Sequence, residues 1–360
     1  MKTLVTQLKK ETADICYQDG RMVDSPGHEK ARLHLIKRLT QIGCVPYIGR
    51  SVELFYTYKN IKFCNLVGRI PGSDSKLAPI LIGAHYDSVI PHPCADDNAA
   101  AVAIALQAGR ILAEKKNNGR DILIAIFDAE EPPYFLGDGM GSHRFYEDHV
   151  LGKREIHAAI IMDLVGHDIS IPGTMLANIP GVGRLANLIP SLAKKDVSVP
   201  MLSSAVFVTG SESHEEMAGV LDAIGQPRDL KIIPTLNKYV GDMSDHGIFR
   251  RNGVPYYFLS CGRWTHYHTP TDTPDRLNYH KMAAITNYVV ELSGQLNECS
   301  LSGRIGHEQT HDTIELESAF MRESLGMLYT PAMKWAGVAD VNTRKSMNKF
   351  VNSLLSAGIG

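Results

Sequence analysis

The sequence has no stretch that approaches the roughly 18 consecutive apolar residues of a membrane span, and we therefore expect none. Its N-terminal segment lacks the apolar core and small-residue cleavage site of a signal peptide, so none is expected there either. Net charge is nearly absent as well: 37 basic and 39 acidic residues give −2, and the basic residues form no long run. These absences argue against nucleic acid or an anionic membrane surface as the main ligand.

Cysteine is scarce and scattered. The six cysteines show no close pairing along the 360 residues. In a chain of this size such usage indicates reduced thiols, mostly packed in the core of a cytoplasmic protein.

Apolar strands alternate with helices along most of the chain. Strands are predicted at 51–58, 61–72, 78–85, 121–131, 156–166 and 254–260, and helices at 28–43, 98–116, 141–150 and 279–296. Several of these strands are apolar throughout, as is typical of strands covered on both faces. The pattern predicts an α/β fold with a mixed, largely parallel central sheet and helices on both faces.

Two regions depart from this alternation. Residues 172–241 mix helix, loop and proline, and we expect an irregular cap or an elaborated crossover there. Residues 301–360 begin polar and then become helical at 314–328 and 342–358. We expect residues 1–300 to form the main domain, and 301–360 to form an appended helical unit that either packs on the body or mediates self-association.

Acidic and imidazole groups gather where three predicted strands end. The groups in question are His85 and Asp87, Glu130 and Glu131, and Asp163; Asp96 and Asp97 open the following alanine-rich helix, and His266 and His268 lie in a later loop. In open α/β sheets, functional groups collect at the carboxyl ends of the strands. Imidazoles and carboxylates from several strand ends are suitable ligands for a hard-to-borderline metal ion, with zinc as the expected one.

Each of these residues, taken alone, has an ordinary structural explanation. An aspartate before a helix is usually an N-cap, a glutamate pair at a strand end is usually a solvated turn, and a loop histidine is more often not a ligand. Asp163 is harder to explain in this way, because it follows the apolar run 158–162, and a buried unpaired carboxylate costs several kcal/mol. The occurrence of all these groups in order favours a metal site.

A set of motifs carries a family resemblance. GAHYDSV, ADDNAA, FDAEEP, GSHRFY, IMDLVG, MSDHGIF and YHTPTDT follow one another in the chain. With this set the sequence resembles the zinc aminopeptidases of metallopeptidase family twenty-eight, which use two co-catalytic metals. The resemblance spans roughly Ser25 to Leu296 and leaves out the tail. It implies a three-layer sandwich of the zinc aminopeptidase and phosphorylase kind, with 1–300 as the catalytic domain.

The resemblance also implies a ligand set for two zinc ions. His85 and Asp163 match ligands of one zinc, Glu131 and His268 match ligands of the other, and Asp97 matches the bridging carboxylate. In the family the peptide bond after this aspartate is often cis.

Three further residues match catalytic positions of the family. Glu130 resembles the general base, Asp87 resembles the group that accepts the other N–H of His85, and Tyr267 matches a position that helps to stabilise an oxyanion in some members. A packed aromatic is an equally good explanation of Tyr267.

Other polar residues near the motifs receive lesser roles. We expect supporting roles for Ser88, Asp96 and Asn98, structural roles for Asp245 and His246, and no ligand role for His92, His167 and His266. Cys94 stands where the family often has glycine, and is expected close to the metals, either as a small packed residue or as an oxidation-sensitive one.

The expected activity is removal of N-terminal amino acids from peptides with a free N-terminus, although some relatives are carboxypeptidases. One alternative is a glutaminyl cyclase, which shares the fold but keeps one zinc. The other is a non-catalytic, metal-stabilised binding domain, against which the presence of Glu130 argues. Residues 132–140 and the cap are expected to shape the substrate pocket.

Overall fold

The computed structural model describes residues 2–172, 196–198, 202–301 and 310–356. A mixed sheet runs through the molecule in the strand order β1-β3-β5-β4-β6-β11-β9-β10, and β2 pairs with β3 beside this path. Its strands are β1 (Val45–Pro46), β2 (Glu53–Tyr58), β3 (Ile61–Ile70), β4 (Ile80–His85), β5 (Ile122–Phe127), β6 (Ala158–Met162), β9 (Ala205–Thr209), β10 (Lys231–Pro234) and β11 (Tyr256–Ser260). A separate antiparallel pair joins β7 (Ser170–Pro172) and β8 (Asp196–Ser198).

The centre of the sheet is parallel. Strands β5, β4, β6 and β11 are neighbours that all run in the same direction, whereas β3 and β9 flank them in antiparallel fashion. Parallel strands present their carboxyl ends at one edge, so four consecutive strand ends meet there. This edge carries the candidate site.

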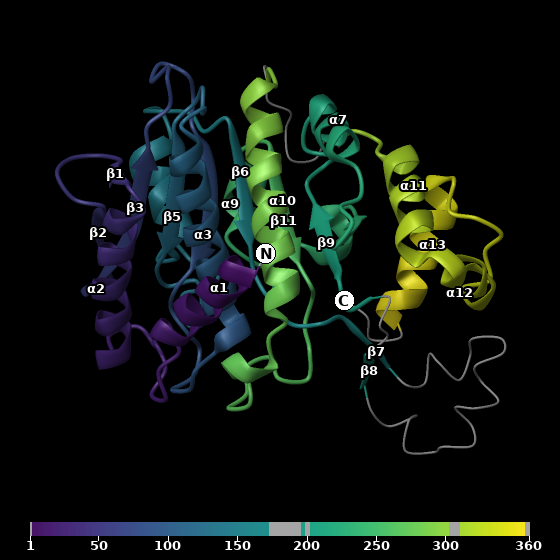
Figure 1. Cartoon of the computed structure of the whole chain (residues 1–360), viewed down its shortest axis with the longest axis horizontal. Coiled ribbons are helices and arrows are strands. Elements are labelled where there is room, and N and C mark those ends of the chain that lie inside the picture. The colour runs from purple at the N-terminus through teal and green to yellow at the C-terminus, as the bar shows by residue number, and fades with distance from the viewer. Residues whose placement is uncertain (1, 173–195, 199–201, 302–309, 357–360) are drawn as a thin grey trace.

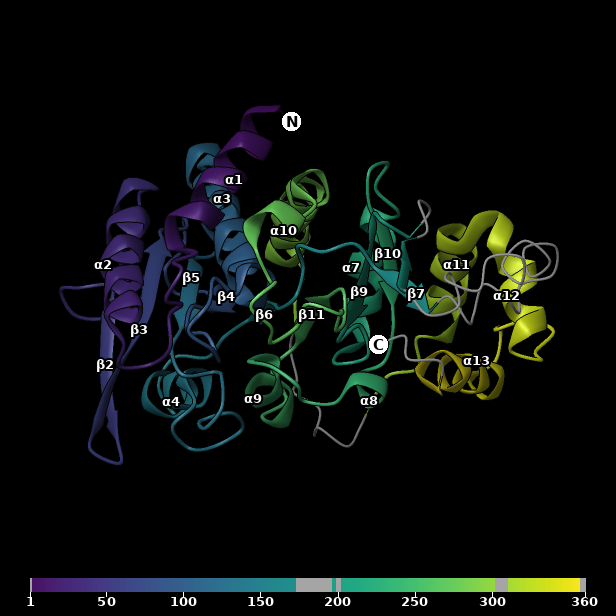
Figure 2. The ribbon, with the colours of Figure 1, turned by 90° about the horizontal axis from the view of Figure 1, so that it is seen from below.

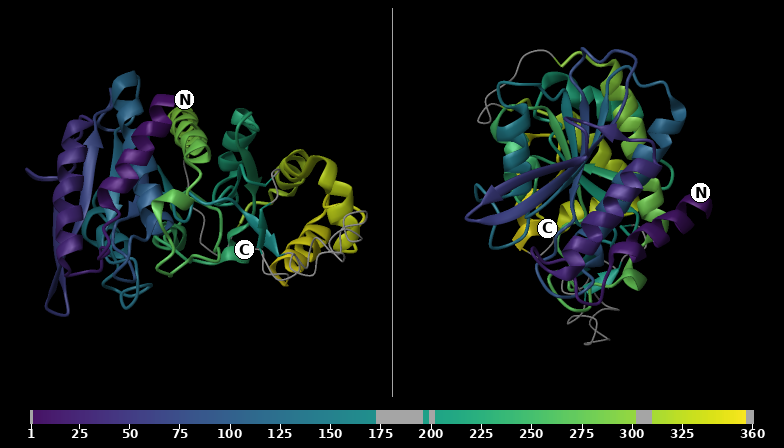
Figure 3. Two further views of the ribbon diagram at one scale, coloured as in Figure 1. Left: turned by 60° about the horizontal axis from the view of Figure 1, so that its bottom comes forward. Right: turned by 90° about the vertical axis from the view of Figure 1, so that its left-hand side faces the viewer.

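Helices cover both faces of the sheet (Figure 2). One face carries α1 (Lys2–Ile15), α2 (Pro26–Gln41), α3 (Ala100–Lys115), α7 (Glu215–Ile224) and α10 (Tyr279–Glu298), and the other carries α4 (Gly141–Phe145) and α9 (His246–Arg251). The end-on view of Figure 3 shows the sheet between these layers. The predicted α/β sandwich is therefore confirmed.

The apolar runs explain why the central strands are buried on both sides. All six residues of β4 and of β5 are buried, and alternate side chains enter two different cores. Ile82 and Ile124 pack under α3 and α10, while Leu81 and Leu123 face α4 and α9. Helix α3 is rich in alanine, which lets it lie close to the sheet.

The region from 172 to 241 contains more sheet than its sequence indicated. We expected an irregular cap or crossover, but β9 and β10 add two strands to the central sheet, and α7 packs in the same core as their side chains. Both strands are short, at five and four residues, and lie between turn residues, which hides their pattern. Residues 173–195 and 199–201 of the expected cap lie outside the described residues.

The tail packs on the body of the protein. It contains α11 (Ile314–Leu325), α12 (Tyr329–Trp335) and α13 (Arg344–Ser356), which Figure 1 shows beyond β9 at one end of the molecule. Helix α11 lies against β10, where the Ser324 hydroxyl donates to the Ile232 carbonyl at 3.0 Å. Within the described residues, no helix combines the length and apolarity needed to cross a bilayer.

Candidate metal centre

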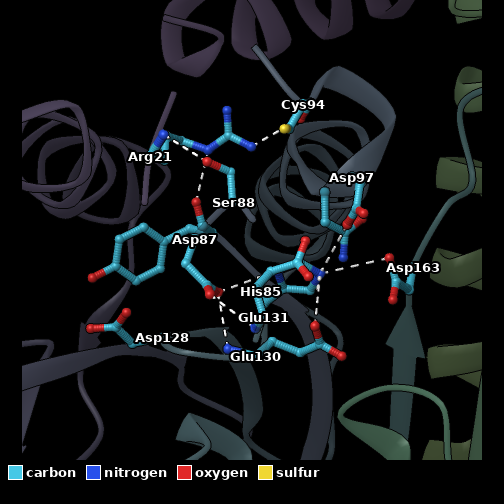
Figure 4. Close-up of polar contacts among 12 residues, drawn as sticks. Arg21, His85, Asp87, Ser88, Cys94, Asp97, Asp128, Glu130, Glu131 and Asp163 are labelled. Carbon is cyan, nitrogen blue, oxygen red and sulfur yellow. Dashed lines mark hydrogen bonds and ion pairs between the residues drawn. The ribbon is translucent and has the colours of Figure 1, made fainter. Parts of the chain in front are cut away.

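The polar residues predicted at the strand ends do converge. His85 ends β4, Glu130 and Glu131 follow β5, and Asp163 follows β6 directly, while His268 reaches the same place from the loop after β11. Figure 4 shows His85 surrounded by carboxylates from these elements. Convergence follows from the topology, because the four strands are parallel neighbours.

A first cluster of donors surrounds His85. Its Nε2 lies 3.5 Å from Asp97 Oδ1, 3.7 Å from Asp163 Oδ1 and 3.7 Å from Glu130 Oε2. His85 is fully buried, and the three carboxylates are buried as well. Glu130 thus approaches His85 as closely as Asp163 does, so the geometry suits it either as a ligand or as a base beside the ligands.

A second cluster surrounds His268. Its Nε2 lies 3.1 Å from Asp97 Oδ2 and 3.3 Å from Glu131 Oε2. Asp97 therefore offers one oxygen to each cluster, which is the arrangement expected of a bridging carboxylate. Two ligand atoms of a tetrahedral zinc site lie about 3.3 Å apart for metal–ligand bonds of about 2 Å, so the separations in both clusters suit a zinc ion.

Several of these atoms have no other partner. Four buried atoms take part in no hydrogen bond with the described residues, namely His85 Nε2, Asp163 Oδ1, Glu131 Oε1 and His268 Nε2. A buried polar atom without a partner costs roughly 1–3 kcal/mol. Metal coordination would remove this cost at all four atoms, and each cluster offers one imidazole and carboxylates, a donor set that zinc accepts. The residues present therefore fit two zinc ions.

The pKa values of the residues in the two clusters also fit a site that binds a cation. Burial raises the pKa of Glu130 well above its usual range, and burial together with the Asp97 carboxylate raises the pKa of Glu131 to about 8. Burial opposes protonation of His268, but Asp97 and Glu131 outweigh it and raise the pKa of His268 to about 9. A divalent ion between these groups would favour ionised carboxylates and neutral imidazoles instead.

Asp87 supports the first cluster through contacts with His85 and with the backbone of Glu130 and Glu131. Its Oδ1 accepts a hydrogen bond from the backbone N–H of Glu130 at 3.1 Å, and its Oδ2 accepts one from that of Glu131 at 3.0 Å. His85 Nδ1 lies 3.3 Å from Asp87 Oδ1. One carboxylate thus orients the imidazole and fixes the turn that carries both glutamates.

The irregular turn Ala95–Ala99 presents Asp97. The peptide bond between Asp97 and Asn98 is cis, as the resemblance implies, and Asn98 Nδ2 donates to the Met162 carbonyl at 3.0 Å. Asp96 turns away from the clusters and accepts hydrogen bonds from the Gly166 N–H at 2.6 Å and from His167 Nδ1 at 2.6 Å. A Cβ at Gly166 would lie 2.8 Å from that carboxylate, so glycine allows the close approach.

Asp272 is a functional residue that the sequence analysis missed. Its carboxylate accepts hydrogen bonds from the backbone N–H groups of Asp96 at 2.9 Å and Asp97 at 3.2 Å. Its only sequence signal was its place in the motif YHTPTDT. Asp272 anchors the turn that presents Asp97.

The backbone around the site is unusual at four non-glycine residues. Positive φ angles occur at Cys94 (+43°), Ala129 (+53°), Leu164 (+54°) and His268 (+55°), each a candidate ligand or a close neighbour of one in the chain. Such conformations cost energy for residues with a Cβ and collect at functional sites. They support a functional rather than an ordinary structural reading of these loops.

The remaining predicted residues have structural contacts. His167 stacks on Trp264, and His266 Nδ1 contacts the Thr271 hydroxyl at 2.7 Å. His246 stacks on Phe258 at 4.0 Å. His92 is half-buried, and none of His92, His167 and His266 belongs to either donor cluster.

Three further predicted residues lie close to the clusters. Burial raises the pKa of Asp245 to about 7 and that of the Cys94 thiol to about 12. Cys94 is buried, which favours the packed residue among its two expected roles. Tyr267 is half-buried and stacks on His268, with ring centroids 3.7 Å apart.

Arg21 is a second residue that the sequence analysis missed. It is fully buried, and its guanidinium donates to the carbonyls of Tyr86 at 2.8 Å, Pro93 at 2.6 Å and Cys94 at 2.9 Å. Ser88 accepts from the Arg21 backbone N–H at 2.8 Å (Figure 4). Arg21 thus ties together the two ends of the loop between His85 and Asp97.

Replacing Arg21 with methionine is expected to lower the free energy of unfolding by about 3–5 kcal/mol, because several buried carbonyls lose charge-assisted donors. Urea unfolding followed by circular dichroism would measure the change. Arg50→Met is the matched control, since Arg50 is exposed and should tolerate the change. A loss below about 1 kcal/mol would show that water replaces the guanidinium.

Comparison with known sequences places this site in a family. The profile of Peptidase family M28 matches residues 65–293. YfbL of Escherichia coli K12, an uncharacterized protein, is 29% identical over 249 residues, which cover 63% of this chain and 69% of that protein. Leucine aminopeptidase 1 of Coccidioides posadasii is 27% identical over 138 residues, 35% of this chain and 33% of that protein.

Solved structures share the fold. LapA of Legionella has a TM-score of 0.61 at 19% identity, with 82% of this chain and 73% of that chain covered. A leucine aminopeptidase precursor of Bacteroides thetaiotaomicron has a TM-score of 0.58 at 16% identity, covering 80% and 96%. A glutaminyl cyclase of the same organism has a TM-score of 0.55 at 16% identity, also covering 80% and 96%.

Proposed function

The chain belongs to peptidase family M28, and from this membership and the two donor clusters we propose that it is a zinc-dependent aminopeptidase. It hydrolyses the first peptide bond of substrates that carry a free N-terminus. The observation that carries the proposal is the pair of buried clusters that share Asp97, with Glu130 beside them. The aminopeptidases among the related proteins support the same reading.

The roles of the residues follow from their positions. His85 and Asp163 would hold one zinc ion, Glu131 and His268 would hold the other, and Asp97 would offer one oxygen to each. Zinc at these positions would lower the pKa of a water molecule and polarise the scissile carbonyl. Glu130 accepts a proton from the attacking water and returns it to the leaving amine.

Two residues assist from the edge of the centre. Asp87 keeps His85 in the orientation that directs Nε2 at the metal, and a partner of this kind raises the basicity of the imidazole. Tyr267 donates a hydrogen bond to the oxyanion that develops on the carbonyl. Its stacking on His268 fixes the ring next to the second cluster.

The presence of two complete donor clusters argues against the cyclase alternative. A glutaminyl cyclase shares this fold, so the fold alone does not separate the two activities. Asp97, Glu131 and His268 form a donor set as complete as that around His85, and a single-zinc enzyme has no need of both.

Activity against defined peptides tests the proposal. The zinc-loaded protein is expected to release leucine from Leu-Gly-Gly and p-nitroaniline from leucine p-nitroanilide, and to leave the Nα-acetylated forms intact. Cyclisation of peptides that begin with glutamine, with one zinc per chain, would instead establish the cyclase. Removal of the C-terminal residue from acetylated peptides would establish a carboxypeptidase, and a lack of any turnover would favour the binding domain.

A further inference from the structure

A mainly apolar cavity adjoins the candidate metal centre. Its volume is about 300 Å³, and Asp163 and Tyr267 line the part next to the clusters. The sheet supplies Phe207 of β9, Ile233 of β10 and Phe258 of β11. Residues of the expected cap region line this cavity, whereas none of residues 132–140, which we also expected to shape the substrate pocket, is among its lining residues.

Helices of the C-terminal tail supply the far wall of this cavity. Met321 of α11 lines it, together with Val351, Leu354 and Leu355 of α13. All four residues lie beyond residue 293, where the match to the family ends. The left view of Figure 3 shows the tail helices at the end of the molecule that carries β9 and β10.

An ion pair, buried apolar side chains and a hydrogen bond fix helix α13 in this position. Arg344 donates to the buried carboxylate of Glu317 on α11, at 2.9 Å and 2.7 Å, and so fixes the start of α13. Met347 and Phe350 are buried in the core that the tail shares with the body. The Tyr239 hydroxyl of α8 (Asn237–Val240), a helix that also lines the cavity, is hydrogen-bonded to Asn348.

We propose that α13 forms the far wall of the pocket that receives the side chain of the substrate's first residue, and that it selects apolar side chains of leucine or methionine size. The inference rests on the proposed aminopeptidase function. Continuity with the clusters through Asp163 places the cavity next to the scissile bond, and its volume is at the lower end of ligand pockets, so it accepts one residue rather than a longer peptide.

The charge of the lining supports an apolar ligand. Among the described residues that line the cavity, only Asp163 and Arg263 are aspartate, glutamate, lysine or arginine. Both lie at the end next to the clusters, where Arg263 is exposed and stacks against Tyr267. A charged substrate side chain that reached α13 would be buried without a partner. The tail is therefore a specificity element, although it lies outside the matched region.

Two substitutions at Leu354 change the depth of the pocket in opposite directions. Leu354→Ala deepens it, and should raise the ratio of kcat/KM for phenylalanine p-nitroanilide over leucine p-nitroanilide about 10-fold or more, within the range that one or a few methylene groups provide in a pocket. Leu354→Trp fills it, and should lower kcat/KM for the leucine substrate by a similar factor while the alanine substrate is spared. Lys345→Ala is the control, because Lys345 lies on the same helix but is exposed and does not line the cavity.

Calorimetric binding of free L-leucine, L-phenylalanine and L-alanine to the zinc-loaded variants gives a readout that does not need turnover. Affinities should change in the same directions as the kinetic ratios. If the ratios and affinities of both Leu354 variants stay within twofold of the wild type, the role of α13 is overturned. If affinities shift as expected while the wild type hydrolyses nothing, the pocket stands and the proposed function falls.

Discussion

Replacing Glu130 with glutamine is expected to lower kcat for aminoacyl amides by about 10²–10⁴-fold, the usual contribution of a general base, with little effect on KM. The amide has the shape of the carboxylate but does not accept a proton at neutral pH. Because Asp87 fixes residue 130 through its backbone N–H rather than its side chain, the substitution should leave the turn in place.

Metal content separates the two roles that the geometry allows. Glu130 Oε2 lies 3.7 Å from His85 Nε2, a distance that also suits a ligand. If Glu130 is the base, the variant keeps two zinc ions per chain by atomic absorption and loses only turnover. Loss of one zinc together with turnover would make Glu130 a ligand, and unchanged turnover would reject the mechanism. Glu114→Gln, an exposed change on α3, is the control.

The sequence predicts the centre of the fold better than its ends. Strands β4, β5, β6 and β11 are continuous apolar runs, and helices α3 and α10 carry long apolar patterns, so local composition defines them. The first helix, α1, was not predicted, although Leu4, Leu8 and Ile15 form its buried side. Strands β9 and β10 were not predicted, because four or five residues carry too little periodicity to be recognised among proline and turn residues.

The candidate site shows a similar division. The convergence of His85, Glu131 and Asp163 could be predicted from the sequence, because strand topology places the carboxyl ends of parallel neighbours at one edge. Arg21 and Asp272 could not, since the backbone groups of the site that they bind lie 65 to 176 residues away in the chain. Nothing in the local sequence of an arginine or aspartate shows that it will bind the backbone of a distant loop.

Both proposed zinc sites share one carboxylate, and we therefore expect Asp97 to be the most sensitive position of the centre. Its two oxygens lie 3.5 Å from His85 Nε2 and 3.1 Å from His268 Nε2. Asp97→Ala should therefore weaken the binding of both zinc ions. The affinity for each should fall by more than the 10–100-fold that follows from loss of a supporting residue. Activity should fall by at least about 10⁴-fold, because the loss of both ions removes metal and base catalysis together.

Zinc titration and thermal unfolding measure this effect on the same samples. In the wild type, zinc at 100 times its dissociation constant should stabilise the fold by about 2.7 kcal/mol for each bound ion, and a chelator should reverse the gain. Asp97→Ala should show little zinc-dependent stabilisation, because neither cluster keeps its shared ligand. Asp275→Ala, an exposed change in the loop that carries His268, should behave as the wild type. Two tightly bound zinc ions in Asp97→Ala would disprove the bridge.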